Sequence, residues 1–162
     1  MWCEKIIRNL ATDPPPGASV DWVDIQWSEC GRILKKQSRA GEPIRVLLPP
    51  GQRLRHKDVI YEDASLAIAI NVQMCEVIVA KIADTKKLAT LALELGNLHL
   101  PTQIDAQEII FIEDGPAMAV LDSLQISWAK EVRRFEPTQI ISVPSVDVSP
   151  ALRVVIRSQK SE

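Results

Sequence analysis

The chain has 162 residues, of which 46% are hydrophobic and 25% charged, and this composition is typical of globular proteins with a packed core. Its length allows one ordinary domain or two small ones. The net charge of −2 argues against a nucleic-acid-binding surface, which normally carries a basic excess. Basic residues do gather locally, and we interpret this group as a solvated strand face. Its members are Arg32, Lys35, Lys36 and Arg39.

The sequence indicates a cytoplasmic protein without a membrane partner. No run approaches the roughly 18 to 20 apolar residues that a membrane span needs. The first residues lead into no long apolar stretch, so a secretory signal is not expected. The cysteines Cys3, Cys30 and Cys75 are odd in number and widely spaced, which fits reduced thiols in the cytosol. Because no CxxC pair exists, we expect no zinc site built on thiolates.

The first half of the chain has the pattern of a small β-domain. Residues 1–19 contain three consecutive prolines, which remove backbone donors and predict an irregular N-terminal arm. In residues 20–74, Val23, Ile25 and Trp27 alternate with polar residues, and turn signals separate several further short apolar runs. Such a series predicts a β-rich domain built as a sandwich or barrel-like unit. The predicted strands are 23–28, 32–39, 44–48, 58–61 and 66–72.

The pattern changes in residues 75–137, where helical periods enter. A nearly continuous apolar strand at 76–82 is followed by Asp84, a residue suited to cap a helix. Apolar residues at helical spacing follow, and Gly96 is expected to end this helix in the left-handed conformation. Asp114 and Pro116 are start signals for a second helix. Further strands are expected at 102–104, 108–112 and 130–136, with Val132 and Phe135 as the apolar members of the last.

This order of elements predicts the fold class. Strand, helix, strand, strand, helix, strand is the βαββαβ arrangement of a ferredoxin-like domain. We therefore expect an α+β protein with an N-terminal small β-domain, a ferredoxin-like domain and an extended C-terminal tail at 138–162. The tail contains Pro144 and Pro150 and then an alternating apolar run. It either docks as an extra strand or stays mobile until a partner orders it.

Histidine is scarce in this chain. The two histidines, His56 and His99, exclude chemistry that requires several imidazoles from one chain. His99 follows a predicted helix end and precedes Pro101, on a connection where side chains are positioned yet reachable. Two interpretations are open: a partly buried, hydrogen-bonded side chain, or a metal ligand. In a two-fold dimer, a residue near the axis meets its own copy and supplies two ligands to one ion. Nickel and copper rank high among divalent ions for imidazole donors.

The segment 93–104, which reads Leu-Glu-Leu-Gly-Asn-Leu-His-Leu-Pro-Thr-Gln-Ile, resembles the helix-end segment of the UreE family of urease accessory proteins, which are nickel chaperones. That family typically has glycine, asparagine, arginine and histidine here, and Leu98 replaces the arginine. The upstream residues fall in the family's order as well, so that the resemblance covers about residues 20–137. They are Trp27, Glu29, Arg32, Arg39, Gly41, Leu47, Leu48, Pro49, Gly51, Leu54, Arg55, Asp58, Val59 and Ile60.

The resemblance implies a homodimer with a peptide-binding-like β-domain followed by a metal-binding domain. His99 matches the family's central histidine, which would bind nickel at the dimer interface, with zinc or copper as other possible guests. The implied function is that of a metallochaperone that delivers nickel to apo-urease. Its implied partners are the urease apoprotein and other urease accessory proteins.

Two departures from the family pattern support a different interpretation. Many members carry a further histidine pair where this chain has residues 113–118, and many have histidine in the tail, where 137–162 hold none. The alternative is a divergent member that acts as a non-metal scaffold or protein-interaction module. His56 is predicted to be structural, because Arg55 and Lys57 flank it and oppose a further positive ion.

The sequence offers little for an enzyme. It contains neither a GxxxxGK[ST] phosphate loop nor a GxSxG elbow. It also lacks the Gly-rich loop that ends in a catalytic arginine in acylphosphatases. We therefore predict no catalytic and no cofactor-binding residues, and the one predicted site residue is the metal ligand His99.

Overall fold

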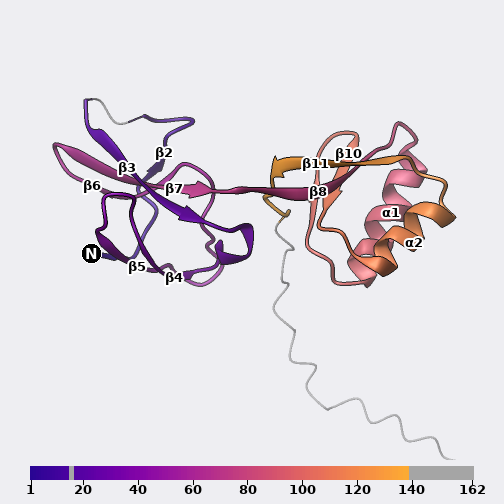
Figure 1. Cartoon of the computed structure of the whole chain (residues 1–162), viewed down its shortest axis with the longest axis horizontal. Coiled ribbons are helices and arrows are strands. Elements are labelled where there is room, and N and C mark those ends of the chain that lie inside the picture. The colour runs from indigo at the N-terminus through magenta and orange to yellow at the C-terminus, as the bar shows by residue number, and fades with distance from the viewer. Residues whose placement is uncertain (15–16, 139–162) are drawn as a thin grey trace, which may run out of the picture.

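The computed structural model describes residues 1–14 and 17–138, which form a β-domain and a ferredoxin-like domain joined end to end (Figure 1). The strands of the β-domain are β1 (Trp2–Cys3), β2 (Arg8–Asn9), β3 (Ser19–Ile25), β4 (Ile33–Gln37), β5 (Pro43–Leu47), β6 (Asp58–Glu62) and β7 (Leu66–Val72), with a 3-10 turn at Trp27–Glu29. The second domain comprises β8 (Met74–Lys81), α1 (Thr85–Asn97), β9 (Thr102–Ile104), β10 (Glu108–Phe111), α2 (Gly115–Ser123) and β11 (Trp128–Arg134).

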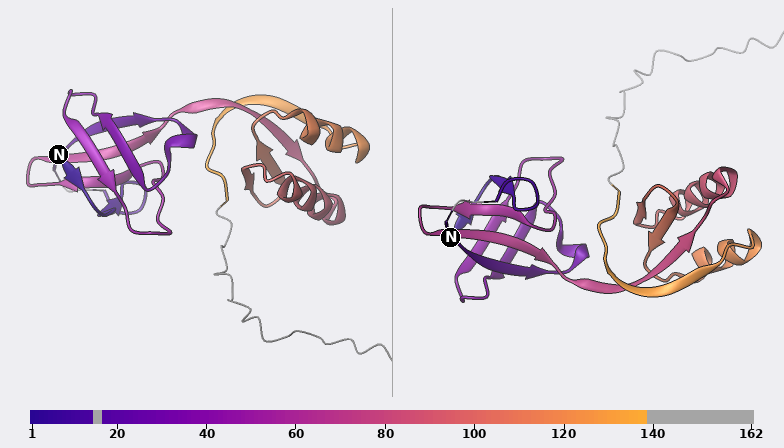
Figure 2. Two further views of the ribbon diagram at one scale, coloured as in Figure 1. Left: turned by 90° about the horizontal axis from the view of Figure 1, so that it is seen from below. Right: turned by 90° about the horizontal axis from the view of Figure 1, so that it is seen from above.

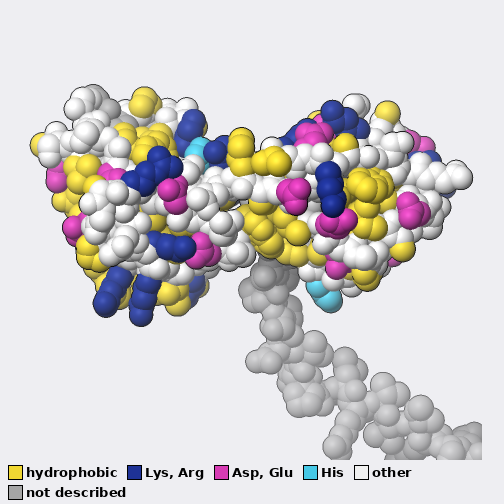
Figure 3. Space-filling model, viewed as in Figure 1, with side chains coloured by type: hydrophobic (Ala, Val, Ile, Leu, Met, Phe, Trp, Pro, Cys, Tyr) yellow, Lys and Arg dark blue, Asp and Glu magenta, His cyan; other side chains and the backbone are white. Residues whose placement is uncertain are grey.

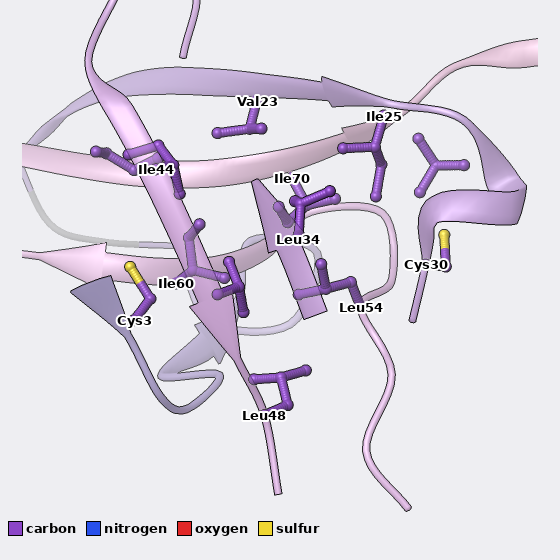
Figure 4. Packing of buried hydrophobic residues seen from close by; sticks show 13 residues of the cluster. Cys3, Val23, Ile25, Cys30, Leu34, Ile44, Leu48, Leu54, Ile60 and Ile70 are labelled. Atoms are coloured by element: carbon purple, nitrogen blue, oxygen red, sulfur yellow. The ribbon is translucent and has the colours of Figure 1, made fainter. Parts of the chain in front are cut away.

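The β-domain consists of two sheets, and its core lies between them. One sheet has the order β1-β5-β4 and the other β2-β6-β7-β3. Period-two burial directs alternate apolar side chains of each strand inward, as in β5, where Ile44 and Val46 are buried and their neighbours are exposed. Ile44 of one sheet faces Val23 and Ile70 of the other across this core (Figure 4). The predicted sandwich-like unit is therefore confirmed.

The N-terminal residues differ from the predicted irregular arm. Trp2–Cys3 pairs in parallel with β5, and Arg8–Asn9 pairs antiparallel with β6. Cys3 is buried in the core of the β-domain. Two-residue strands have no period that a sequence pattern can reveal, and that is why this pairing was not predicted. The predicted segment limits, 1–19, 20–74, 75–137 and 138–162, stay predictions. Of the predicted tail, the structure describes Thr138 alone.

The predicted strand at 23–28 also ends earlier than expected. β3 stops at Ile25, and Trp27 begins a 3-10 turn instead of continuing the alternation. The turn is held by a capping box, in which the Gln26 N–H donates to the Glu29 carboxylate at 2.9 Å. Trp27 is thereby turned toward the second domain, where its ring contacts Phe135.

The ferredoxin-like domain is confirmed in its element order and its topology. Its sheet has the strand order β11-β8-β10-β9 with every pair antiparallel. The β8-α1-β9 unit therefore joins two parallel strands with β10 inserted between them, and β10-α2-β11 does the same around β8. Both predicted helix starts are confirmed, because Asp84 and Asp114 accept backbone hydrogen bonds at the N-caps of α1 and α2.

Both faces of β8 are covered, in agreement with its continuous apolar sequence. Even-numbered residues such as Ile78 pack against Leu91 and Leu95 of α1 and against α2. Odd-numbered residues, Val77 and Val79, pack with Phe135 on the opposite face. None of the helices in the described part of the chain is long and apolar enough to cross a membrane.

The two domains touch at a small junction beside the continuous path from β7 into β8 (Figure 2). The Trp27 and Phe135 rings meet edge to face with centroids 5.1 Å apart. The Arg134 Nε donates to the carbonyl of Val72 at 2.8 Å, and the Glu136 carboxylate accepts the backbone N–H of His56 at 3.3 Å. These contacts bring the end of β11 against the β-domain.

Candidate metal site at His99

The end of α1 places His99 in an unusual backbone conformation. His99 has φ = 54°, in the left-handed region, directly after the C-cap residue Leu98. Its N–H donates to the Gly96 carbonyl at 3.0 Å, and the N–H of Leu100 donates to the Leu95 carbonyl at 3.1 Å. These two bonds are those of a Schellman motif, in which His99 occupies the left-handed C′ position.

Gly96 was therefore wrongly predicted as the left-handed residue. It lies inside α1, and the helix continues to Asn97. The reason is the apolar contact that a Schellman motif makes between its C″ residue and the helix. With His99 at C′, the C″ residue is Leu100, which packs on the cluster that contains Leu95. A stop at Gly96 would instead have placed the polar Asn97 at that position.

The second helix ends in the same way, which shows that the apolar contact sets the position. Gln125 has φ = 52°, and the N–H of Ile126 donates to the Leu121 carbonyl at 3.0 Å. Ile126 and Leu121 both belong to the buried cluster beneath the helices. In each helix a polar non-glycine residue accepts the left-handed conformation so that the next residue reaches the core.

The imidazole of His99 is exposed at the end of the ferredoxin-like domain. Within residues 1–14 and 17–138, no hydrogen bond or ion pair involves its ring nitrogens. Large exposed apolar side chains occur nearby in the chain: Leu98 directly before it, Leu93 on α1 and Ile104 on β9. The His99 ring is therefore free to coordinate an ion, and exposed apolar side chains lie close to it in the sequence.

A single chain does not surround an ion at His99. Among the described residues, no group of three or more histidine, cysteine, aspartate or glutamate side chains is arranged to hold a metal. Burial raises the pKa of Cys3 and Cys75, and it raises the pKa of Cys30 to about 11. These cysteines therefore stay protonated at neutral pH and are poor ligands there. An ion at His99 would therefore need its other donors from outside this set.

His56 belongs to the β-domain, where its backbone N–H donates to Glu136 at the domain junction, whereas His99 belongs to the ferredoxin-like domain. Its ring stacks on Trp22 with centroids 6.3 Å apart, and its buried Nδ1 has no hydrogen-bond partner among the described residues. Burial, with the positive charges of Arg134 and Lys57, lowers the pKa of His56 to about 4. The ring is thus neutral at physiological pH, and its neighbours disfavour a bound cation.

The domain junction also borders an open cavity that the sequence did not reveal. Its volume is about 670 Å³, and residues of both domains line it. Arg53, Arg55 and Asp58 come from the β-domain, whereas Gln103 and Glu136 come from the ferredoxin-like domain. These side chains are distant in sequence, so that no local motif could signal the cavity. His99 does not line it.

Comparison with known proteins gives a consistent result over both domains. Residues 3–73 match the family model "UreE urease accessory protein, N-terminal domain", and residues 75–144 match the model of the C-terminal domain. The chain is 36% identical over 137 residues to "Urease accessory protein UreE" of Actinobacillus pleuropneumoniae, covering 81% of this chain and 73% of that protein. It is 31% identical to the protein of the same name from Lysinibacillus sphaericus, covering 84% of this chain and 93% of the relative.

A more distant relative, "Urease accessory protein UreE" of Halalkalibacterium halodurans, is 26% identical over 137 residues and covers 84% of this chain. The similarity spans both the β-domain and the ferredoxin-like domain, and it agrees with the element order of the structure. The chain belongs to the UreE family of urease accessory proteins.

Proposed function

We propose that this protein is a nickel metallochaperone that works as a homodimer in the cytoplasm and delivers nickel to apo-urease, without catalytic activity of its own. The observation that carries the proposal is the exposed imidazole of His99 at the helix end, in a chain of the UreE family. The urease apoprotein and other urease accessory proteins are its proposed partners.

A dimer supplies what one chain lacks. Two copies of His99 that meet at a two-fold axis give one ion two imidazole ligands. The exposed side chains of Leu93, Leu98 and Ile104 provide apolar surface near His99 that a second copy would cover. Leu98 also removes the like-charge repulsion that two facing arginines would create at this position.

The sparse ligand set suits delivery better than storage. Two imidazoles leave the other positions of the nickel shell to water or to a carboxylate. Water ligands exchange readily, so that an acceptor protein with more ligands can take the ion. We expect nickel to be preferred, with copper and zinc as competitors, because imidazole binds all three.

The metal-binding claim is tested by calorimetric titration of nickel into the wild type and into His99→Asn. Asparagine tolerates the left-handed conformation, so this variant removes the imidazole and keeps the helix end. We expect about one nickel ion per two wild-type chains and no binding by the variant. His56→Gln is the matched control, and it should bind nickel as the wild type does. Equal nickel binding by His99→Asn would refute the assignment.

A second candidate is a scaffold that has kept the fold and lost its metal. It is favoured by the absence of a three-ligand group from residues 1–14 and 17–138. A wild-type protein that binds no nickel in the same titration, yet associates stably with urease accessory proteins, would select this function.

A further inference from the structure

The outer face of the β1-β5-β4 sheet carries large apolar side chains together with cations. Trp2, Ile33 and Leu47 are 56%, 61% and 36% exposed. The register places Trp2 opposite Arg45, Arg45 opposite Lys35, and Leu47 opposite Ile33. Because residues directly opposite in a sheet lie on the same face, these five form one continuous surface. Basic side chains indeed gather below β4 and β5 (Figure 3). We name this surface the β4 face.

The strand β4 is also an edge whose backbone is open. Among the described residues β5 is its only ladder partner, and just beyond β4 the Arg39 N–H donates to the Trp22 carbonyl of β3 at 2.8 Å, so the open stretch runs from Ile33 to Gln37. The Leu48 N–H donates to the Arg32 carbonyl, and the Ser38 N–H donates to the Glu42 carbonyl. In an antiparallel ladder every second residue bonds to the partner strand, so residues 32, 34, 36 and 38 bond to β5. The N–H and C=O groups of residues 33, 35 and 37 therefore point away from it.

The cations of the β4 face differ from the nearby cations Lys36 and Arg39 in their ion pairs. Lys36 pairs with Glu29 at 2.9 Å, and Arg39 pairs with Asp24 at 2.7 Å. Within the described part of the chain, Lys35 and Arg45 take part in no such ion pair. Glu4 accepts a hydrogen bond from the Trp2 indole, but it follows β1, at the edge of the sheet opposite β4. The charge next to the open edge is therefore positive and uncompensated.

We propose that β4 is the docking edge for an extended, acidic segment of a partner protein, which adds to the sheet as a further strand. The outward backbone groups of residues 33, 35 and 37 supply main-chain hydrogen bonds, which give a strand-addition site its affinity. Alternate side chains of the segment lie on the β4 face, where carboxylates meet Lys35 and Arg45, and aliphatic groups meet Ile33. This docking is independent of nickel and of His99.

The test uses the blocked hexapeptide Thr-Val-Thr-Glu-Thr-Glu as a probe, whose valine and glutamates share one face of a strand, titrated into the full-length 15N-labelled protein. The amides of Ile33, Lys35 and Gln37 should shift and gain protection from hydrogen exchange, because they acquire acceptors. The affinity should fall as salt is raised, since exposed charges are screened. The matching peptide with lysine in place of glutamate should bind more weakly.

Variants separate the charge from the backbone contribution. Lys35→Glu should weaken binding of the acidic peptide by at least about threefold, within the range of exposed ion pairs, whereas Lys86→Glu on α1 should leave it unchanged. Gln37→Pro removes an outward N–H without breaking the bonds to β5, and it should also weaken binding. His99→Asn should bind the peptide as the wild type does.

Three results would overturn the proposal. The first is that the acidic peptide shifts no amide of β4. The second is equal binding of the acidic and basic peptides, or equal binding by Lys35→Glu. The third is a concentration-dependent shift of the β4 amides without peptide, which would make a second copy of this chain the occupant of the edge.

Discussion

At the residue scale, the two histidines have opposite surroundings, and these separate their roles. His99 presents an exposed ring with no partner among the described residues. His56 instead stacks on Trp22 with its Nδ1 buried, and it lies beside the cations of Arg134 and Lys57. A ring in the first environment can accept an ion, whereas a ring in the second is held neutral and contributes to packing.

His56 should make the folded state sensitive to mild acid. Its pKa is about 4 in the folded protein and near 6.5 in the unfolded chain, so the unfolded chain takes up the proton first as the pH falls. The free energy of unfolding is therefore highest above pH 6.5 and should fall by about 2 kcal/mol toward pH 4, less than the full shift because the ring is partly screened. Urea denaturation at pH 7 and pH 5 measures this loss.

The variant His56→Phe provides the control for that experiment. Phenylalanine keeps the stacked ring and has no titrating group, so that most of the loss between pH 7 and pH 5 should disappear. An equal loss in wild type and variant would show that other groups cause it.

At the element scale, the end of α1 shows which chain property positions the candidate ligand. The apolar Leu100 must reach the cluster that contains Leu95, and this requirement carries the helix past Gly96 and gives His99 the left-handed position. The histidine is thereby held on a short, hydrogen-bonded turn rather than on a loose loop. The exposure of the His99 ring follows from the way the helix end packs.

Glycine and alanine should have opposite effects at the two positions of this helix end. His99→Gly should unfold with a free energy about 1 kcal/mol higher than His99→Ala, because alanine is strained at positive φ. At position 96, Gly96→Ala should instead stabilise by up to about 1 kcal/mol, since the residue is helical and an added Cβ meets no described atom within 4 Å beyond its chain neighbours and the helix backbone. Chemical denaturation of the three variants gives both differences. A destabilised Gly96→Ala would contradict the position of the helix end.

The sequence was sufficient where a periodic pattern was long enough to record burial. The short apolar run of β5 between two turns, the apolar run of β8 and the caps Asp84 and Asp114 each predicted an element that the structure contains. The sequence was insufficient where contacts between distant residues decide the local structure. The two-residue strands β1 and β2 exist only through their partners, and Trp27 leaves the alternation at a 3-10 turn to meet Phe135. His99 was found by its sequence context, whereas its backbone conformation was not.

At the scale of the whole molecule, the two domains share a junction built around Phe135. This ring is fully buried against Val77, Val79 and Ile110 of the ferredoxin-like sheet, and it contacts Trp27 of the β-domain. The junction therefore joins the surface that carries His99 to the domain that carries the β4 face. Both proposed surfaces lie on one molecule without sharing a residue.

Removal of the Phe135 ring should weaken the protein strongly. Phe135→Ala should lower the free energy of unfolding by about 3 to 5 kcal/mol, the usual cost of truncating a buried phenylalanine. Val132, the other apolar residue predicted for the last strand, is 64% exposed, so Val132→Ala should change stability by less than about 0.5 kcal/mol. Urea denaturation followed by tryptophan fluorescence measures both. Similar losses for the two variants would contradict the assignment of Phe135 to the junction.

The central claim is that two copies of His99 bind one nickel ion, and a crystal structure of the nickel-soaked protein tests it most directly. Anomalous scattering at the nickel edge should locate one ion on a two-fold axis between two chains. One nitrogen of each His99 ring should lie at about 2.0 to 2.1 Å from it, on the scale of zinc–imidazole bonds. A nickel ion bound away from His99, or a dimer in which the two His99 rings do not face each other, would contradict the account.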